Sequence, residues 1–363
     1  MTLSTDQLLF TPGPLSTTSS VKQAMLRDLG SRDAEFLDIV REIRTRLLEI
    51  GGVAGSYEAV PMQGSGTFAV EAAVGSMIPR DGKLLVCVNG AYGRRLAVIA
   101  QRLTIDTVVL EFGETEPLDA SRVAGTLKRE GPFSHVAAIH CETTSGILNP
   151  IGEVGAAAAS AGSSFIVDAM SSFGGIPFDI PGCHIDCLIS SANKCLQGVP
   201  GFAFVLIRRD HLLQCEGRAR SLSLDLHAQW AGLEADGQFR FTPPIQALLA
   251  FRQALRELEQ EGGVAARHAR YCANHAVLMD GMLAMHFVPF IAGVSRSPII
   301  TAFRYPDDPA FRFARFYDDL ASRGFIVYPG KLEHEEGFRI GTIGNVFPDD
   351  VRRLIAAIGQ VLP

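Results

Sequence analysis

Short apolar runs alternate with amphipathic stretches through much of this chain, and this alternation limits the folds open to it. The runs that predict β-strands are residues 58–62, 83–88, 107–111, 135–140, 164–167, 187–190 and 202–207. Helical patterns lie between most of them and before the first; at 33–50, for example, Phe36, Ile39, Val40, Ile43 and Leu47 fall on one face. Strands connected through helices form an open, mostly parallel sheet covered on both faces. We therefore predict an α/β fold, whose ligands bind beyond the carboxyl ends of the strands.

The C-terminal part predicts a smaller unit that mixes helices with a few strands. We expect helices at about 245–261, 264–285, 309–323 and the C-terminus, and strands at 299–303, 326–328 and 337–340. The first 20 residues are loop-like, because Thr11-Pro12-Gly13-Pro14 can be neither helix nor central strand. We predict a large domain over residues 16–250. Residues 1–15 and 251–363 are expected to form a small α+β domain.

Composition and charge exclude several classes of function. The 363 residues carry a net charge of −6 and no basic block, so nucleic acid is not an expected partner. No run of residues has the length and apolar character of a membrane span, and Met1 to Phe10 does not resemble a signal peptide. The seven cysteines are scattered and odd in number, and the segment around Cys183 and Cys187 lacks zinc-site spacing. We expect a cytoplasmic protein without a metal site.

Lys194 follows an apolar run that ends in small polar residues, Ser190-Ser191-Ala192-Asn193. Burial disfavours a charged ammonium, and a neutral amine is the form that attacks a carbonyl to give a Schiff base. Asp168 closes the preceding strand run and is therefore expected at the same edge of the sheet. The pair suggests pyridoxal phosphate, with the lysine bound to the cofactor and the aspartate beside the pyridine nitrogen. A surface lysine, or a buried Asp–Lys ion pair, is the structural alternative.

Gln63-Gly64-Ser65-Gly66-Thr67 links a strand run to a helical stretch. Glycines let a ligand approach the backbone, and the N–H groups that open a helix bind phosphate. The same run reads G-x-G-x-x-A, which could mark a dinucleotide site. That reading requires an acidic residue at the end of the next strand, where this chain has Asn89. Ser65, Gly66 and Thr67 are therefore candidate phosphate ligands, and an ordinary tight turn is the alternative.

Three further residues are candidates for the site. Tyr92 lies between glycines beyond the strand run 83–88 and could stack on a flat ring. Thr143 follows the strand run that ends at His140 and could reach the ring or the phosphate. Arg339 lies inside a short apolar strand, where arginine is rare without an anionic partner. Its guanidinium matches carboxylate or phosphonate oxygens, so we expect it to bind the substrate anion. A packed loop tyrosine, a capping threonine and a structural ion pair are the respective alternatives.

These motifs resemble those of class V aminotransferases of fold type I over nearly the whole chain. The segments that carry the resemblance are residues 9–15, 89–93, 166–175, 190–201, 221–226 and 338–341. The resemblance implies that Lys194 is the Schiff-base lysine and Asp168 the partner of the pyridine nitrogen. It assigns Ser65, Gly66 and Thr67 to the phosphate, Tyr92 to ring stacking, Thr143 to a ring contact and Arg339 to the substrate anion. Thr242 would reach the phosphate of the other subunit's cofactor, which implies a homodimer with shared sites.

The resemblance also implies a reaction. The expected donor is 2-aminoethylphosphonate and the expected acceptor is pyruvate, giving phosphonoacetaldehyde and L-alanine in phosphonate breakdown. The alternative within the family is alanine–glyoxylate or serine–pyruvate transamination. Residues 30–36 depart from the family pattern, so the resemblance does not assign residues to the outer wall of the substrate pocket. Arg32, Arg94 and Arg95 are either further phosphonate contacts or surface charges.

Overall fold

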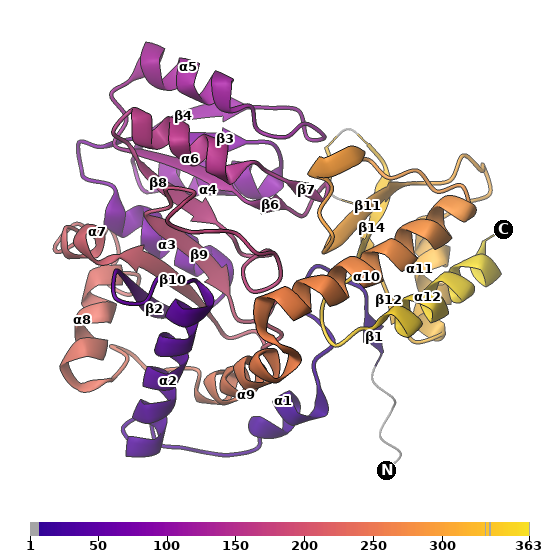
Figure 1. Cartoon of the computed structure of the whole chain (residues 1–363), viewed down its shortest axis with the longest axis horizontal. Helices are drawn as coiled ribbons and strands as arrows, with labels where there is room; N and C mark the ends of the chain where they lie inside the picture. The colour runs from indigo at the N-terminus through magenta and orange to yellow at the C-terminus, as the bar shows by residue number, and fades with distance from the viewer. Residues whose placement is uncertain (1–6, 331, 334, 363) are drawn as a thin grey trace.

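The computed structural model describes residues 7–330, 332–333 and 335–362. Its larger part is organised by a seven-stranded sheet of order β2-β10-β9-β8-β5-β3-β4 (Figure 1). The strands are β2 (Tyr57–Gln63), β3 (Lys83–Val88), β4 (Asp106–Glu111), β5 (His135–Ile139), β8 (Ser164–Asp168), β9 (Cys187–Ser191) and β10 (Phe202–Arg208). All the predicted strand runs of this region are confirmed. The other strands share one direction and β10 alone is antiparallel to both its neighbours, so the mostly parallel sheet is also confirmed.

Side chains of each central strand alternate between two apolar cores, which explains why the runs are apolar throughout. On β3, Leu85 and Cys87 join one core, whereas Leu84, Val86 and Val88 join the other. The first core is closed by α2 (Ala34–Ile50), α5 (Ala120–Glu130), α6 (Ile151–Ser160) and α9 (Ile245–Glu261). The second is closed mainly by α3 (Gly66–Met77) and α4 (Ala91–Arg102), together with α7 (Arg209–Leu213) and the start of α8 (Leu226–Asp236). The sheet is therefore buried on both faces, as the alternation predicts.

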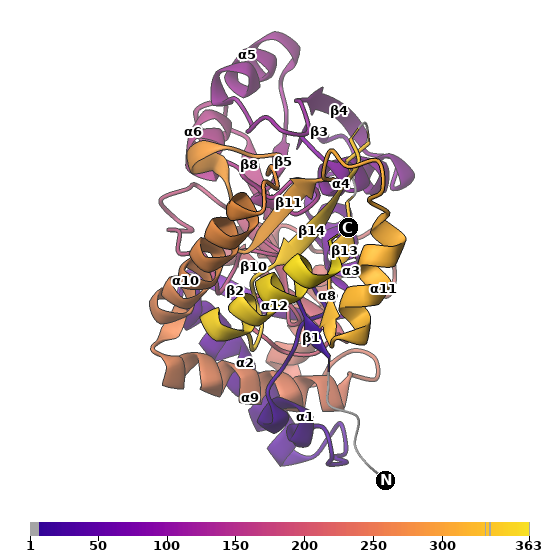
Figure 2. The same cartoon turned by 90° about the vertical axis from the view of Figure 1, so that its right-hand side faces the viewer.

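The C-terminal part forms a further apolar core, separate from these two, around a three-stranded antiparallel sheet of order β11-β14-β13. Its strands are β11 (Ile300–Arg304), β13 (Tyr328–Pro329) and β14 (Gly337–Gly341). Figure 2 shows the helices α10 (Gly263–Ala284), α11 (Phe313–Ser322) and α12 (Pro348–Val361) around this sheet. The N-terminal segment joins the same core through Phe10, and β1 (Leu8–Leu9) pairs in parallel with β12 (Phe325–Ile326). The division at residues 250 and 251 stays a prediction.

Two local predictions were wrong. The single strand expected at 326–328 is two short strands, because β12 pairs with the N-terminal β1 and β13 turns to pair with β14. The first 20 residues are not all loop, since they contain β1 and the start of α1 (Ser19–Ala24), whose Thr18 hydroxyl accepts the Val21 N–H. Within the described residues, no helix combines the length and apolar character needed to cross a bilayer.

Candidate active site

Lys194 and Asp168 meet at the carboxyl ends of neighbouring strands. Asp168 is the last residue of β8, and Lys194 comes three residues after β9. Burial is the main cause that lowers the pKa of Lys194, although the nearby Asp168 acts to raise it. Burial raises the pKa of Asp168 to about 6, against the opposing effects of the Met170 amide, which donates to its carboxylate at 2.9 Å, and of Lys194. The pKa of the carboxyl is thus raised and that of the amine is lowered, so both lie closer to neutral pH than usual.

The N-terminal segment covers the lysine. Its ammonium donates a hydrogen bond to the Pro12 carbonyl at 2.7 Å. A Cβ on Gly13, which has φ +125°, would lie 2.6 Å from Lys194 Cδ and 2.8 Å from Nζ. Only glycine therefore allows this close approach of the backbone to the lysine.

Most of the predicted site residues line one cavity. Its walls include Ser65, Gly66, Thr67, Tyr92, Asp168 and Lys194. Ser65 is the N-cap of α3 but its hydroxyl makes no capping hydrogen bond, so the first turn of α3 offers polar groups to the cavity. Ser191, on the same wall, has a buried hydroxyl that lacks a partner within the described part of the chain. A buried polar atom of this kind calls for a partner that the protein alone does not supply.

Arg339 lies beside this cavity rather than in its wall. Its guanidinium is 1% exposed and donates from Nη1 to the Thr143 carbonyl and from Nε to the Pro329 carbonyl, both at 3.0 Å. Burial lowers the pKa of Arg339, and the adjacent Tyr92 side chain opposes that shift. Among the residues the structure describes, no carboxylate lies within ion-pair distance of Arg339. A buried cation without a carboxylate partner is suited to receive an anionic ligand.

Thr143 and Thr242 lie outside the cavity wall. Thr143 is buried and faces Arg339 with its carbonyl. Thr242 is exposed at the end of an irregular segment, where its carbonyl accepts a hydrogen bond from the Gln63 side chain. Phe241 beside it is 42% exposed. The structure therefore brings Ser65, Gly66, Thr67, Tyr92, Asp168 and Lys194 together, places Thr143 and Arg339 next to them, and leaves Thr242 on the surface.

Three residues of the site were missed by the sequence prediction or left undecided. Ser191 lies in the run before Lys194, where its position at a strand end was the available signal. Arg95 was left open between a ligand contact and a surface charge; it lines the cavity, lies 4.9 Å from the Tyr92 ring centroid and donates to the Thr67 hydroxyl at 3.3 Å. Glu142 is fully buried behind Tyr92. No local pattern marks Glu142, because the Tyr92 and Gly93 N–H groups that it accepts belong to a distant helix.

The cavity fits pyridoxal phosphate on its own chemistry. A helix start with the unpartnered hydroxyl of Ser191 suits the phosphate, Tyr92 offers a flat aromatic face, and Asp168 offers a carboxylate to a ring nitrogen. Lys194 supplies the amine on the same wall. Within the described residues, no group of three or more His, Cys, Asp or Glu side chains could hold a metal ion.

Comparison with known proteins agrees with this chemistry. Residues 17–309 match the family described as aminotransferase class-V. The chain is 53% identical over 351 residues to the 2-aminoethylphosphonate–pyruvate transaminase of Syntrophobacter fumaroxidans, covering 96% of this chain and 95% of the relative. It is 50% identical over 361 residues to the protein of the same name from Klebsiella pneumoniae, covering 99% and 98%.

A solved structure with a similar fold is an alanine–glyoxylate aminotransferase from Nostoc. It superposes with a TM-score of 0.92 at 26% identity, covering 100% of this chain and 97% of that one. A pyridoxamine–pyruvate aminotransferase from Mesorhizobium loti gives a TM-score of 0.90 at 25% identity, covering 98% and 92%. Family match, sequence identity and fold agree, and this chain belongs to the class V aminotransferases.

Proposed function

We propose that this chain transfers the amino group of 2-aminoethylphosphonate to pyruvate, giving phosphonoacetaldehyde and L-alanine in phosphonate breakdown. The observation that carries this proposal is the identity of about one half, over nearly the whole chain, to relatives named for this reaction. The alanine–glyoxylate enzyme shares the fold at only 26% identity. The alternative reaction within the family is therefore not favoured.

The enzyme depends on pyridoxal phosphate, which supplies an electron sink for the pair of electrons released when the donor carbon loses its proton. We propose that Lys194 binds it covalently and that Asp168 keeps its ring nitrogen protonated. The positive charge on that nitrogen would offset the cost of burying the carboxylate. Ser65, Gly66 and Thr67, joined by Ser191, would hold the phosphate, while Tyr92 packs on the ring. Thr143 would contribute through its position beside Arg339 and Tyr92.

Lys194 also serves as the general acid–base of the proposed reaction. With its amine free and neutral, Lys194 would take the proton from the donor carbon and hold it at Nζ. The lowered pKa of Lys194 favours the neutral form that this step needs. The Pro12 carbonyl gives the released amine a fixed acceptor.

Arg339 is proposed to bind the anionic end of both substrates. The donor ends in a phosphonate and the acceptor in a carboxylate, and a guanidinium fork matches both geometries. Its buried place beside Tyr92 would hold the anion at one end of the cavity, with Lys194 facing the reacting carbon. One cation would then serve both halves of the reaction.

We further propose a cytoplasmic homodimer in which Thr242 reaches the partner's cofactor phosphate. The exposed pair Phe241 and Thr242 supports this, because an apolar ring beside a hydroxyl is available to a second copy. All seven cysteines are unpaired, in keeping with a reducing compartment. Sedimentation of wild-type protein and of a Phe241→Asp variant would test the dimer, which should weaken in the variant and not in an exposed control, Leu213→Asp.

The visible spectrum of purified protein with pyridoxal phosphate tests the reaction. Adding 2-aminoethylphosphonate without pyruvate should bleach the cofactor's visible band, and pyruvate should restore it. A band that responds to alanine or serine but not to 2-aminoethylphosphonate would contradict the proposed donor. Lys194→Ala should lose the band and turnover, whereas Lys128→Ala, an exposed change on α5, should keep both.

A further inference from the structure

The turn that carries Lys194 is closed by its own backbone. The N–H of Gln197 donates to the Lys194 carbonyl at 2.8 Å, and the N–H of Gly198 donates to the Ala192 carbonyl at 2.8 Å. Gln197 has φ +61°, a left-handed conformation that non-glycine residues seldom adopt. Such a conformation is strained, and it persists where surrounding contacts fix it. The turn is therefore held in place by something outside itself.

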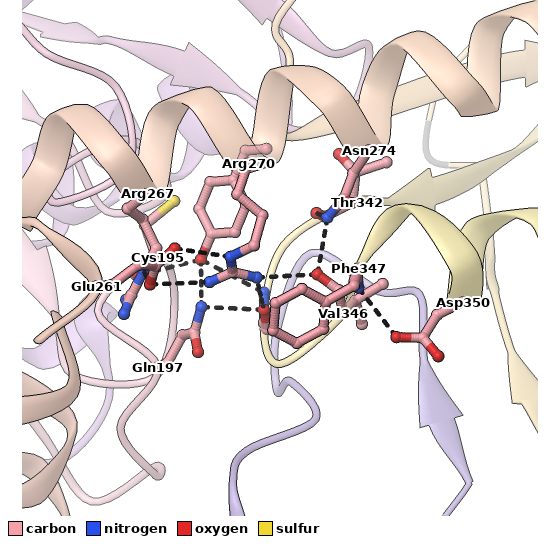
Figure 3. A network of polar contacts seen from close by, with 12 residues as sticks. Cys195, Gln197, Glu261, Arg267, Arg270, Asn274, Thr342, Val346, Phe347 and Asp350 are labelled. Carbon is pink, nitrogen blue, oxygen red and sulfur yellow. Dashed lines mark hydrogen bonds and ion pairs between the residues drawn. The ribbon is translucent and has the colours of Figure 1, made fainter.

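Buried side chains of α10 supply that support (Figure 3). The carbonyl of Cys195, the residue after Lys194, accepts hydrogen bonds from Arg267 Nη1 at 2.9 Å and from the Tyr271 hydroxyl at 3.2 Å. The Arg267 guanidinium is almost fully buried and is paired with Glu261 at 2.6 Å. Burial raises the pKa of Tyr271 to about 12, so its hydroxyl keeps the proton that it donates. Two donors thus fix the peptide unit next to the lysine.

The Tyr271 hydroxyl also connects the turn to the small domain. It accepts a hydrogen bond from Gln197 Nε2 at 2.7 Å and a longer one from the Gly344 N–H at 3.4 Å. Gln197 Nε2 donates as well to the Gly344 carbonyl at 2.9 Å. We call Gln197, Arg267 and Tyr271, with the Cys195 carbonyl and Gly344, the Tyr271 hub. Because Gly344 comes three residues after β14, the hub reaches the strand that carries Arg339.

The same helix holds that segment by further bonds. Arg270 Nη1 donates to the carbonyls of Gly344 and Val346 at 2.8 and 2.9 Å, and Asn274 Nδ2 donates to those of Thr342 and Val346 at 3.0 and 2.9 Å. Arg270 shares Glu261 with Arg267. One helix therefore holds both the turn after Lys194 and the chain after Arg339.

We infer that Tyr271, Arg267 and Gln197 are positioning residues that fix the amine of Lys194 relative to the guanidinium of Arg339. This inference rests on the proposed function of those two residues. A substrate whose anion is bound at Arg339 has its reacting carbon at a fixed distance from that guanidinium. The amine of Lys194 must therefore lie next to that carbon. Misplacement of a reacting group by about 1 Å can cost about 100-fold in rate. A direct tie between the two supports keeps this distance constant.

Tyr271→Phe tests the inference, because it keeps the ring in the core and removes the hydroxyl. We expect kcat to fall about tenfold in both half-reactions while KM for each anion changes less than about twofold, since Arg339 still binds it. The pH midpoint of the bound cofactor's visible absorbance should also move, because that midpoint reports the surroundings of Lys194. Gln197→Gly is the second variant; glycine suits φ +61° and removes both side-chain bonds.

Tyr317→Phe on α11 is the matched control and should leave rates and midpoint unchanged. The inference is supported if both hub variants bind as much cofactor as the wild type but have a lower kcat and a shifted pH midpoint of the cofactor's absorbance. It is overturned if they keep both wild-type values, or if their loss of rate follows loss of bound cofactor alone. If one variant does not fold, the other decides. The comparison of pH midpoints needs no amino donor, so it remains a valid test if the wild-type protein does not react with 2-aminoethylphosphonate. That lack of reaction would contradict the proposed substrate alone.

Discussion

The carboxylate of Glu142 lies behind the first turn of α4 and accepts the backbone N–H of Tyr92 at 3.2 Å. It also accepts the N–H of Gly93 at 3.3 Å and the hydroxyl of Thr144 at 2.7 Å. Gly90, the N-cap of α4, has no side chain to satisfy these donors, and a Cβ there would lie 2.4 Å from Glu142. A residue from β6 (Cys141–Glu142), which pairs with β7 (Ile147–Leu148), thus caps the helix that presents Tyr92 to the cavity.

Glu142→Ala should destabilise the protein and weaken its hold on the cofactor. The change leaves buried N–H groups without an acceptor, which costs about 1–3 kcal/mol for each unsatisfied group. We expect a lower free energy of unfolding in urea and a larger dissociation constant for pyridoxal phosphate, because Tyr92 is less well placed. Glu142→Gln keeps an acceptor oxygen and should lose less. Equal behaviour of Glu142→Ala and the exposed control Glu216→Ala would contradict the capping role.

The free energy of unfolding of the cofactor-free protein should depend on pH because of Asp168. Its pKa is raised from 3.8 to about 6, so between those values the folded protein holds a proton that the unfolded chain has released. Acidification therefore favours the folded state in this window, and raising the pH removes the benefit. The free energy of unfolding of the wild type, relative to Asp168→Asn, should fall by about 2 kcal/mol from pH 4 to pH 7. Urea titrations at both pH values measure it; a constant difference would contradict the burial of this carboxylate.

Gly13→Ala should reduce activity more than its effect on stability explains. The new Cβ would overlap the Lys194 side chain and force the amine away from the Pro12 carbonyl. We expect kcat to fall about tenfold, because the proton-transferring group is displaced. Gly55→Ala is a matched control, since Gly55 also has positive φ but its Cβ would meet no atom within 4 Å. Thermal melting should fall in both variants, and only Gly13→Ala should lose turnover.

Arg339→Lys should raise KM for both substrates. Lysine keeps the charge but loses the planar fork and the two bonds to the Thr143 and Pro329 carbonyls. Losing one charge-assisted hydrogen bond of about 1.5–3 kcal/mol corresponds to roughly a 10- to 100-fold rise in KM for 2-aminoethylphosphonate and for pyruvate. Arg304→Lys, on the neighbouring strand β11, should leave both constants unchanged. A rise for one substrate alone would show that the two anions bind at different places.

Local patterns predicted the strands, the main helices and six residues of the cavity wall. The strands of the large sheet are apolar because they are buried on both faces, and polar residues at their ends therefore stand out. Asp168 and Lys194 were found in this way. The roles assigned to these two residues, and to the other candidate residues of the site, stay predictions.

Residues whose importance depends on distant partners gave no local signal. Glu142 caps a helix that precedes it by about forty residues, and Tyr271 contacts a turn that lies far earlier in the chain. The split of residues 325–329 into β12 and β13 depends on pairing with the chain's first strand. Long-range pairing decides these features, and a single sequence does not display it.

The pairing of β1 with β12 joins the N-terminal segment to the C-terminal part of the chain, and this sets an order of assembly during synthesis. All strands of the seven-stranded sheet, and Lys194 itself, have been made once residue 208 has left the ribosome. The segment of Pro12 and Gly13, although made first, has no strand to pair with until Phe325 and Ile326 appear. Between the synthesis of Lys194 and that of β12, the nascent chain therefore has no N-terminal segment paired in place to cover the lysine.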